Sequence, residues 1–131
     1  MNELGVPPAD GWGTANMVSE AWEGASPRLL LIESQGRVAT DAGFRRDAVT
    51  QVLTGQSALL FLVQDGVVLA VPGSDSDLDR FQEQGGVLAA DSFSLAQHGL
   101  DTAALRPELR VVGMDVVAGW ILDPAVRVVW H

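Results

Sequence analysis

The residues best suited to chemistry gather in one short stretch of the sequence, 85-GGVLAADSFSLAQHGL-100. Val87 to Ala90 form an apolar run of strand length, which leads into a polar turn with Asp91 and Ser94, and His98 follows one helical turn later. In α/β proteins, the turn from the carboxyl end of a strand into the next helix is where chemistry usually lies. We therefore take Asp91, Ser94 and His98 as the candidate site.

These residues permit two interpretations, one chemical and one structural. Ser94 and His98 are four positions apart and would face each other on a helix, so Asp91 or Asp101 could complete a hydrolytic Ser–His–Asp set. The stretch has no Gly-x-Ser-x-Gly elbow or other oxyanion motif to support it. We favour the simpler interpretation, a polar turn that caps a helix and carries a surface histidine.

The residue types that are missing exclude several mechanisms. The chain has no cysteine, so it can form no disulfide, zinc thiolate or persulfide, and its sequence also has no lysine for Schiff-base chemistry. His98 and His131 are the two imidazoles. The aspartates at 75, 77 and 79 lack the glycine and glutamate of a calcium loop and predict a helix N-terminus instead. We expect no metal and no cofactor.

Charge and hydropathy narrow the partners and the compartment. The formal net charge of -9 disfavours nucleic acid or an anionic membrane as a direct partner, because both require clustered positive charge. Residues 1–27 contain no Lys or Arg, so the basic region of a signal peptide is missing. No apolar run approaches the ~20 residues that span a bilayer. We expect a cytoplasmic protein.

The composition divides the chain into residues 1–27 and residues 28–131. The first part is rich in Gly, Pro and Ala and predicts a flexible extension. It also carries Trp12 and Trp22, and the apolar spacing from Met17 to Trp22 would place one stripe on a short helix. This stripe could pack on its own domain or on another subunit.

Residues 28–131 alternate apolar runs with helical spacings. The predicted strands are 28–34, 57–63, 87–90, 109–113 and 126–130, and the predicted helical segments begin at Thr40 or Asp41, around Leu78 and Phe81, and around Val116 to Ile121. Strands that are apolar throughout predict a sheet covered on both faces. The predicted fold is therefore a three-layer α/β sandwich with a mainly parallel sheet of about five strands.

The stretch Gln64-Asp65-Gly66-Val67 permits two structures. Asp-Gly between apolar runs is a strong hairpin signal. Alternatively, the strand ends here and Asp65 caps a helix over Val67 to Val71, as the crossover between parallel strands requires.

Several of these stretches resemble the DsrE/DsrF/DsrH superfamily of sulfur-relay proteins, nearest the TusB/DsrH branch. They are LLFLVQDGVVLAV, GGVLAADSFSLAQHGL, LRVVGMD and a tryptophan near the end of the last strand. The resemblance covers Leu29 to Trp130, and Gln64 to Val67 with His98 to Leu100 carry its most specific part. It implies a DsrE-like fold in which Asp65 opens a helix.

The resemblance also implies a function. In the catalytic branches the turn after the third strand tends to read Cys-x-x-Cys-x-x-x-x-Gly, and a persulfide forms there. Counted back from Gly99, the two cysteine positions fall on Asp91 and Ser94, which cannot hold transferable sulfur. We expect a vestigial site in a non-catalytic accessory subunit, which shapes the site of a cysteine-bearing partner in a sulfur-relay complex. The alternative is a self-assembled protein that binds a small ligand at residues 91–98.

The resemblance and the tryptophans together predict an oligomer. We expect a homo- or hetero-oligomer with DsrE/DsrF-like subunits, and we name Trp12, Trp22, Trp120 and Trp130 as candidate interface residues. Arg45 and Arg46 are expected to be solvated surface charges.

Overall fold

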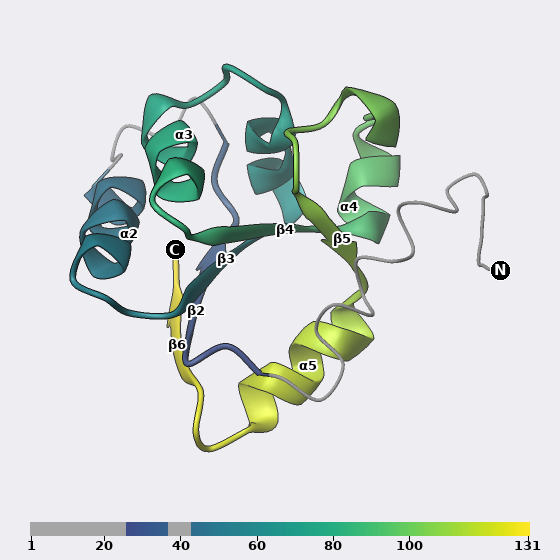
Figure 1. Cartoon of the computed structure of the whole chain (residues 1–131). Coiled ribbons are helices and arrows are strands. Elements are labelled where there is room, and N and C mark those ends of the chain that lie inside the picture. Colours follow the sequence, from purple (N-terminus) through teal and green to yellow (C-terminus); the bar gives the residue numbers. More distant parts are fainter. Residues whose placement is uncertain (1–25, 37–42) are drawn as a thin grey trace, which may run out of the picture.

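The computed structural model describes residues 26–36 and 43–131, and they form an all-parallel α/β unit (Figure 1). The strands are β2 (Leu29–Glu33), β3 (Ala58–Leu62), β4 (Val87–Asp91), β5 (Arg110–Val112) and β6 (Arg127–Trp130). The helices are α2 (Gly43–Leu53), η1 (Gln64–Ala70), α3 (Ser76–Glu83), α4 (Ser92–Gln97), η2 (Thr102–Ala104) and α5 (Met114–Leu122). The predicted start of the first helix, at Thr40 or Asp41, lies outside the described residues.

The strand order β5-β4-β3-β2-β6 confirms the predicted fold class. All four pairings are parallel, with Leu31 opposite Leu60 on one side of β2 and opposite Val129 on the other. Every residue of β2 and β3 is buried, as expected for central strands whose two faces are both covered. The continuous apolar runs therefore identified the central strands of the sheet correctly.

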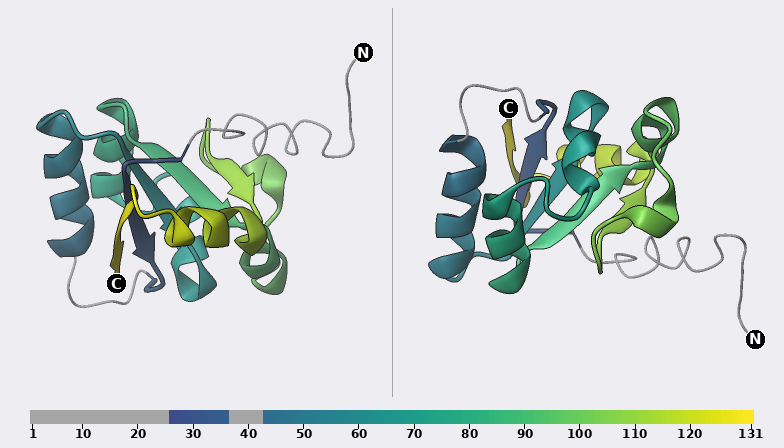
Figure 2. Two further views of the ribbon diagram at one scale, coloured as in Figure 1. Left: turned by 90° about the horizontal axis from the view of Figure 1, so that it is seen from below. Right: turned by 90° about the horizontal axis from the view of Figure 1, so that it is seen from above.

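The sheet separates two apolar clusters. Helix α5 covers one face of the sheet, and the other helices lie on the opposite face (Figure 2). Leu29, Leu31 and Leu60 belong to the larger cluster, together with side chains of α2, η1, α3 and α4. The opposite face contributes Leu30, Ile32 and Phe61, on which Val117 and Trp120 of α5 pack. Such burial contributes roughly 25 cal/mol for each Å² of apolar surface removed from water, and it is the main source of the fold's stability.

The direction in which the chain crosses the sheet reverses at β2. From β2 the chain proceeds through β3 and β4 to β5, and α5 then carries it across to β6 on the other side of β2. In open α/β sheets, sites form outside the carboxyl ends of the strands at this reversal. The carboxyl ends of β2 and β6, at Glu33 and Trp130, are therefore one expected location of functional side chains.

The ambiguous stretch after β3 is a 3₁₀ helix, η1, so the hairpin alternative is wrong. Asp65 lies in its first turn, as the resemblance implied, but the N-cap is Val63 and makes no side-chain hydrogen bond, so Asp65 is not the cap. Gly66 explains the tight course of this segment. A Cβ atom on Gly66 would lie 2.2 Å from the carbonyl oxygen of Glu33.

The aspartates at 75, 77 and 79 form a helix N-terminus, as predicted. Asp75 is the N-cap of α3, and its carboxylate accepts the Leu78 N–H at 3.0 Å. Asp77 and Asp79 occupy the first turn, where negative charge is favourable because it complements the helix dipole. Leu78 and Phe81 are fully buried, which confirms the predicted apolar face.

The proposed division at residue 27 is not tested, because residues 1–25 lie outside the described part of the chain. Within the described residues, no helix has the length and apolar character needed to cross a membrane.

We predict that Gly66→Ala destabilises the fold, because the new methyl group would collide with the Glu33 backbone. The expected loss is about 1–3 kcal/mol of unfolding free energy, the usual cost of overpacking. Gly119→Ala is the matched control, since its Cβ position in α5 has no heavy atom within 4 Å apart from its chain neighbours and the backbone of its own helix. This control is expected to stabilise the protein by about 0.5–1 kcal/mol. Urea unfolding measures both, and equal stability of Gly66→Ala and the wild type would contradict the packing argument.

Candidate functional site

The strand-to-helix turn after β4 is closed by its own hydrogen bonds. Asp91 is the N-cap of α4, and its Oδ2 accepts the Ser94 backbone N–H at 2.9 Å and the Ser94 hydroxyl at 2.7 Å. The Ser94 hydroxyl oxygen in turn accepts the backbone N–H of Gln64 at 2.9 Å. This chain of bonds ties the end of β3 to the start of α4.

Gln64 shows how tightly this tie constrains the backbone. Its φ is 55°, the left-handed region that non-glycine residues rarely occupy. A residue held there costs of order 1–3 kcal/mol and persists only where its surroundings fix it. The hydrogen bond to Ser94 is one such restraint, so Ser94 fixes the route by which the chain leaves β3.

His98 lies at the carboxyl end of α4 and does not contact the Ser94 hydroxyl. One ring nitrogen, Nδ1, lies 3.0 Å from the Ser94 carbonyl oxygen, and Nε2 lies 3.3 Å from Oδ1 of Asp65. The Ser94 hydroxyl donates its proton to Asp91 instead. The hydrolytic Ser–His–Asp arrangement is therefore not formed, and the geometry matches the capped turn with a surface histidine.

The three predicted residues share one hydrogen-bonded turn but differ in accessibility. Asp91 is 3% exposed and Ser94 is 2% exposed, so neither side chain is open to a ligand. The side chain of His98 is partly exposed and that of Asp65 is largely exposed. The Oδ1 atom of Asp91 is buried without a hydrogen-bond partner among the described residues. A buried carboxylate oxygen without a hydrogen bond is uncommon in folded proteins.

Two exposed apolar side chains flank the closed turn. Phe93 in the first turn of α4 is 67% exposed, and Met114 at the start of α5 is 41% exposed. The two helix starts lie close together, since a Cβ atom on Gly113 would be 4.0 Å from the Ser92 hydroxyl. We call Phe93 and Met114 the α4–α5 patch.

A second polar cluster lies at the reversal point, at the ends of β2 and β6. The Glu33 side chain is fully buried, and its Oε1 accepts a hydrogen bond from Arg45 at 2.7 Å. The other oxygen, Oε2, lies 2.8 Å from Nδ1 of His131 and accepts the Gln35 N–H at 3.1 Å. The His131 ring also stacks on Phe44, with ring centroids 4.9 Å apart.

Arg45 completes this cluster with a second carboxylate. Its Nε lies 3.3 Å from Oδ1 of Asp75, so the guanidinium links the end of β2 to the start of α3. Burial by itself would lower the pKa of Arg45, but the hydrogen bond to Glu33 and the charge of Asp75 outweigh it and raise the pKa above its ordinary value. Arg45 therefore remains charged and balances the buried Glu33.

The expectation that Arg45 is solvated is wrong, whereas its neighbour Arg46 is exposed as expected. Glu33 was the available indication, because it ends a strand that is otherwise apolar and buried. A carboxylate in such a place requires a cation or several hydrogen-bond donors. Nothing in the local pattern indicates which arginine supplies the charge.

The predicted interface tryptophans have different surroundings. Trp12 and Trp22 lie outside the described residues. Trp120 is only 5% exposed and packs against the sheet from α5, so little of it remains for a partner to cover. Trp130, in β6, is 56% exposed and stays available. Its interface role remains a prediction.

No group of three or more His, Cys, Asp or Glu is placed to hold a metal ion in residues 26–36 and 43–131. In the turn and in the Glu33 cluster, most of the polar groups bind other protein groups, and Asp91 Oδ1 is a buried atom without a hydrogen bond to any described residue.

Sequence comparisons and structure comparisons give different results for this chain. No family model and no curated protein matches its sequence. Among solved structures, YchN of Escherichia coli has a similar fold, with a TM-score of 0.71 at 15% identity over 80% of this chain and 99% of YchN. The shared architecture defines this chain as an α/β protein with a DsrE-like fold.

Two further structures support the same assignment of fold. A protein of unknown function from Methanobacterium thermoautotrophicum has a TM-score of 0.63 at 15% identity, over 79% of this chain and 96% of its own. A protein of unknown function from Bacteroides thetaiotaomicron also has a TM-score of 0.63, at 14% identity, over 79% and 95% of the two chains. These likenesses establish the fold and do not distinguish the TusB/DsrH branch.

We predict that Arg45→Ala is strongly destabilising, because it would leave Glu33 buried without its cation. Breaking a buried ion pair from one side typically costs about 3–5 kcal/mol. Arg46→Ala is the control at the adjacent, exposed position and should change stability by no more than about 0.5 kcal/mol. Thermal and urea unfolding measure both variants. Equal effects of the two substitutions would show that the Glu33 cluster does not hold the fold together.

Proposed function

We propose that this chain is a non-catalytic subunit of a cytoplasmic sulfur-relay complex, where it assembles with DsrE/DsrF-like subunits and supports the site of a cysteine-bearing partner. The observation that carries the proposal is the turn after β4. In a DsrE-like fold, the chain has Asp91 and Ser94 where the resemblance places cysteines, and it uses both to close the turn.

The closed turn argues against sulfur chemistry within this chain. A persulfide requires a thiolate, and Asp91 supplies a carboxylate that is already bonded to Ser94. Under this proposal, the turn keeps the position of a relay site but not its nucleophile. The sulfur-carrying residue would have to come from another subunit.

The α4–α5 patch is the surface that we assign to this partner. Phe93 and Met114 lie beside the turn, and exposed aromatic and methionine side chains are enriched at the centres of protein interfaces. A partner that covers them would bring its own residues close to the turn that Asp91 begins. The net charge of -9 further favours a partner with a basic surface.

The alternative function, binding of a small ligand at residues 91–98, has less support. Asp91 and Ser94 are buried, so a ligand would meet mainly His98 and Asp65.

We predict that the purified chain accepts no sulfur from a small-molecule persulfide, because it has no thiol. Intact-mass spectrometry after incubation measures this directly, with Asp91→Cys in the same chain as a matched comparison. We expect the wild-type mass to stay unchanged. A stable gain of one sulfur atom by the wild type would contradict the proposal.

We predict further that the chain binds a DsrE/DsrF-like subunit that has a cysteine at the position equivalent to Asp91. Phe93→Asp should weaken this binding at least tenfold, because it places a charge in an apolar contact. Leu122→Asp is the control, because Leu122 on α5 is 81% exposed and lies outside the α4–α5 patch. Co-purification and calorimetry measure the binding. Equal binding of both variants, or failure to bind any such subunit, would contradict the proposal.

A further inference from the structure

The strand β6 is an open edge of the sheet. Among the described strands it pairs with β2 alone, and all four of its residues are exposed. Val129 is 45% exposed and Trp130 is 56% exposed. Proteins usually protect such an edge with lysine, proline or a bulge, because its free N–H and C=O groups can pair with another strand. β6 has Arg127 as its one charged residue and contains no proline.

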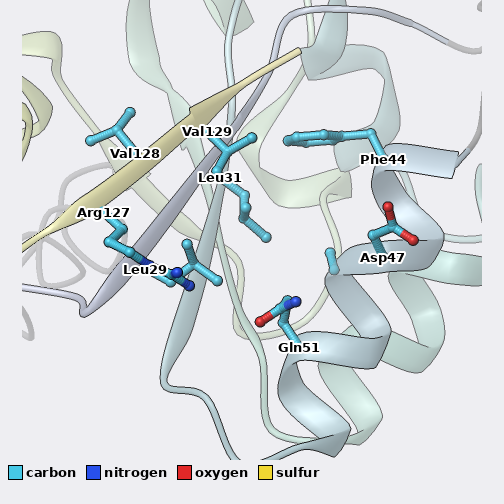
Figure 3. A pocket seen from close by; sticks show the side chains of 9 residues that line it. Leu29, Leu31, Phe44, Asp47, Gln51, Arg127, Val128 and Val129 are labelled. Carbon is cyan, nitrogen blue, oxygen red and sulfur yellow. The ribbon is translucent and has the colours of Figure 1, made fainter.

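An apolar groove of ≈ 510 Å³ runs along this edge, between β6 and α2 (Figure 3). Leu29 and Leu31 of β2 lie at its floor, and Val129 of β6 lies beside them. The charged residues that line it are Asp47 on α2 and Arg127 on β6. The edge therefore combines free backbone groups with an apolar surface that has one cation and one anion.

We propose that β6 is a two-fold interface, at which a second copy of this chain pairs its own β6 in antiparallel orientation. A two-fold axis perpendicular to the sheet keeps the two faces of the sheet aligned, so residues opposite each other must point to the same face. A two-fold axis through Val129 meets this condition. On the face of the sheet that carries the grooves, Val129 then lies opposite Val129 of the copy. On the other face, Val128 lies opposite Trp130 of the copy.

Charge complementarity favours a second copy in this register. Arg127 lies opposite Leu29 at the start of β2, whereas Phe44, near Asp47 on α2, stacks on His131 at the other end of β6. Antiparallel pairing places the copy's Arg127 opposite His131, at the end of the groove that carries Phe44 and Asp47. The two-fold axis repeats this arrangement in the second groove.

The net negative charge of the chain restricts where two copies can meet. A net charge of -9 opposes self-association over most of the surface, because two copies repel each other. β6 contains no acidic residue, so it is a place where two copies can approach. The inference goes beyond the relay function and does not rest on it, since the α4–α5 patch lies at the far side of the sheet order, beside β4 and β5.

The absence of cysteine allows a direct test in the full chain. Val129→Cys would place two thiols opposite each other at the two-fold axis, at a spacing that a disulfide can bridge. Leu122→Cys is the control, because Leu122 is more exposed but lies on α5. Under mild oxidation at equal concentration, we expect a disulfide-linked dimer for Val129→Cys and at least tenfold less for Leu122→Cys. Equal cross-linking of the two variants would overturn the proposal.

Light scattering supplies the second measurement. We expect the wild type to be a dimer, or a larger assembly built from dimers, at tens of micromolar, and Val129→Asp to weaken the contact at least tenfold while circular dichroism stays unchanged. Asp47→Arg should weaken the dimer roughly two- to fivefold, as for an exposed ion pair, and Arg127→Asp added to it should restore part of the affinity. A wild-type monomer, or a dimer that Val129→Asp leaves intact, would overturn the proposal.

Other occupants of the edge would give distinguishable results. If the segment 1–25 of the same chain covers β6, the protein is a monomer in which Trp22→Ala increases hydrogen exchange at Val128 to Trp130, and the proposal is wrong. If the cysteine-bearing subunit occupies this edge, Val129→Asp abolishes its binding, which also overturns the proposal. If Val129→Asp breaks the dimer and that binding persists, the two surfaces are separate, as proposed.

Discussion

The buried carboxylate of Glu33 is the interaction on which the arrangement at the carboxyl end of the sheet depends. It ends a fully buried strand, so the charge is tolerated only because Arg45 and His131 converge on it. Arg45 extends the contact to Asp75, which is also the N-cap of α3. The Glu33 side chain thus joins the end of β2 to α2 and to His131 after β6, and Arg45 extends the connection to α3. The backbone carbonyl of Glu33 also restricts position 66 in η1 to glycine.

The turn after β4 shows a different use of polar groups. Asp91 and Ser94 stabilise the start of α4 and the exit from β3, and their hydrogen bonds engage the Ser94 hydroxyl, which is therefore not available to act on a substrate. The positions at which the resemblance expects cysteines therefore serve local structure here. The proposed subunit role would use the fold as a scaffold and leave the reaction to a partner. The exposed α4–α5 patch beside the turn is the surface that we propose for such a partner.

The two surfaces proposed for assembly lie at opposite ends of the sheet order. The α4–α5 patch belongs to the side with β4 and β5, and the open strand β6 lies at the other edge, beyond β2. A chain with one contact at each side can bind a copy of itself through β6 and a different subunit near Asp91. Repetition of both contacts would build a mixed assembly from this chain and its partner. Its acidic surface would confine association to these sites, because unspecific contacts between copies are repulsive.

The sequence alone determined the strands, their parallel arrangement, the capped helix after residue 75 and the absence of thiol chemistry. These follow from short-range patterns, such as continuous apolar runs and the residue types at helix starts. Only the tertiary structure decided that Arg45 is buried and Arg46 exposed, that His98 faces Asp65 rather than the Ser94 hydroxyl, and that Trp120 is covered while Trp130 is not. Each of these depends on a residue far away in the chain, whose position is set by how helices and strands pack. Local propensity carries no information about that packing, because it is fixed by contacts across the sheet.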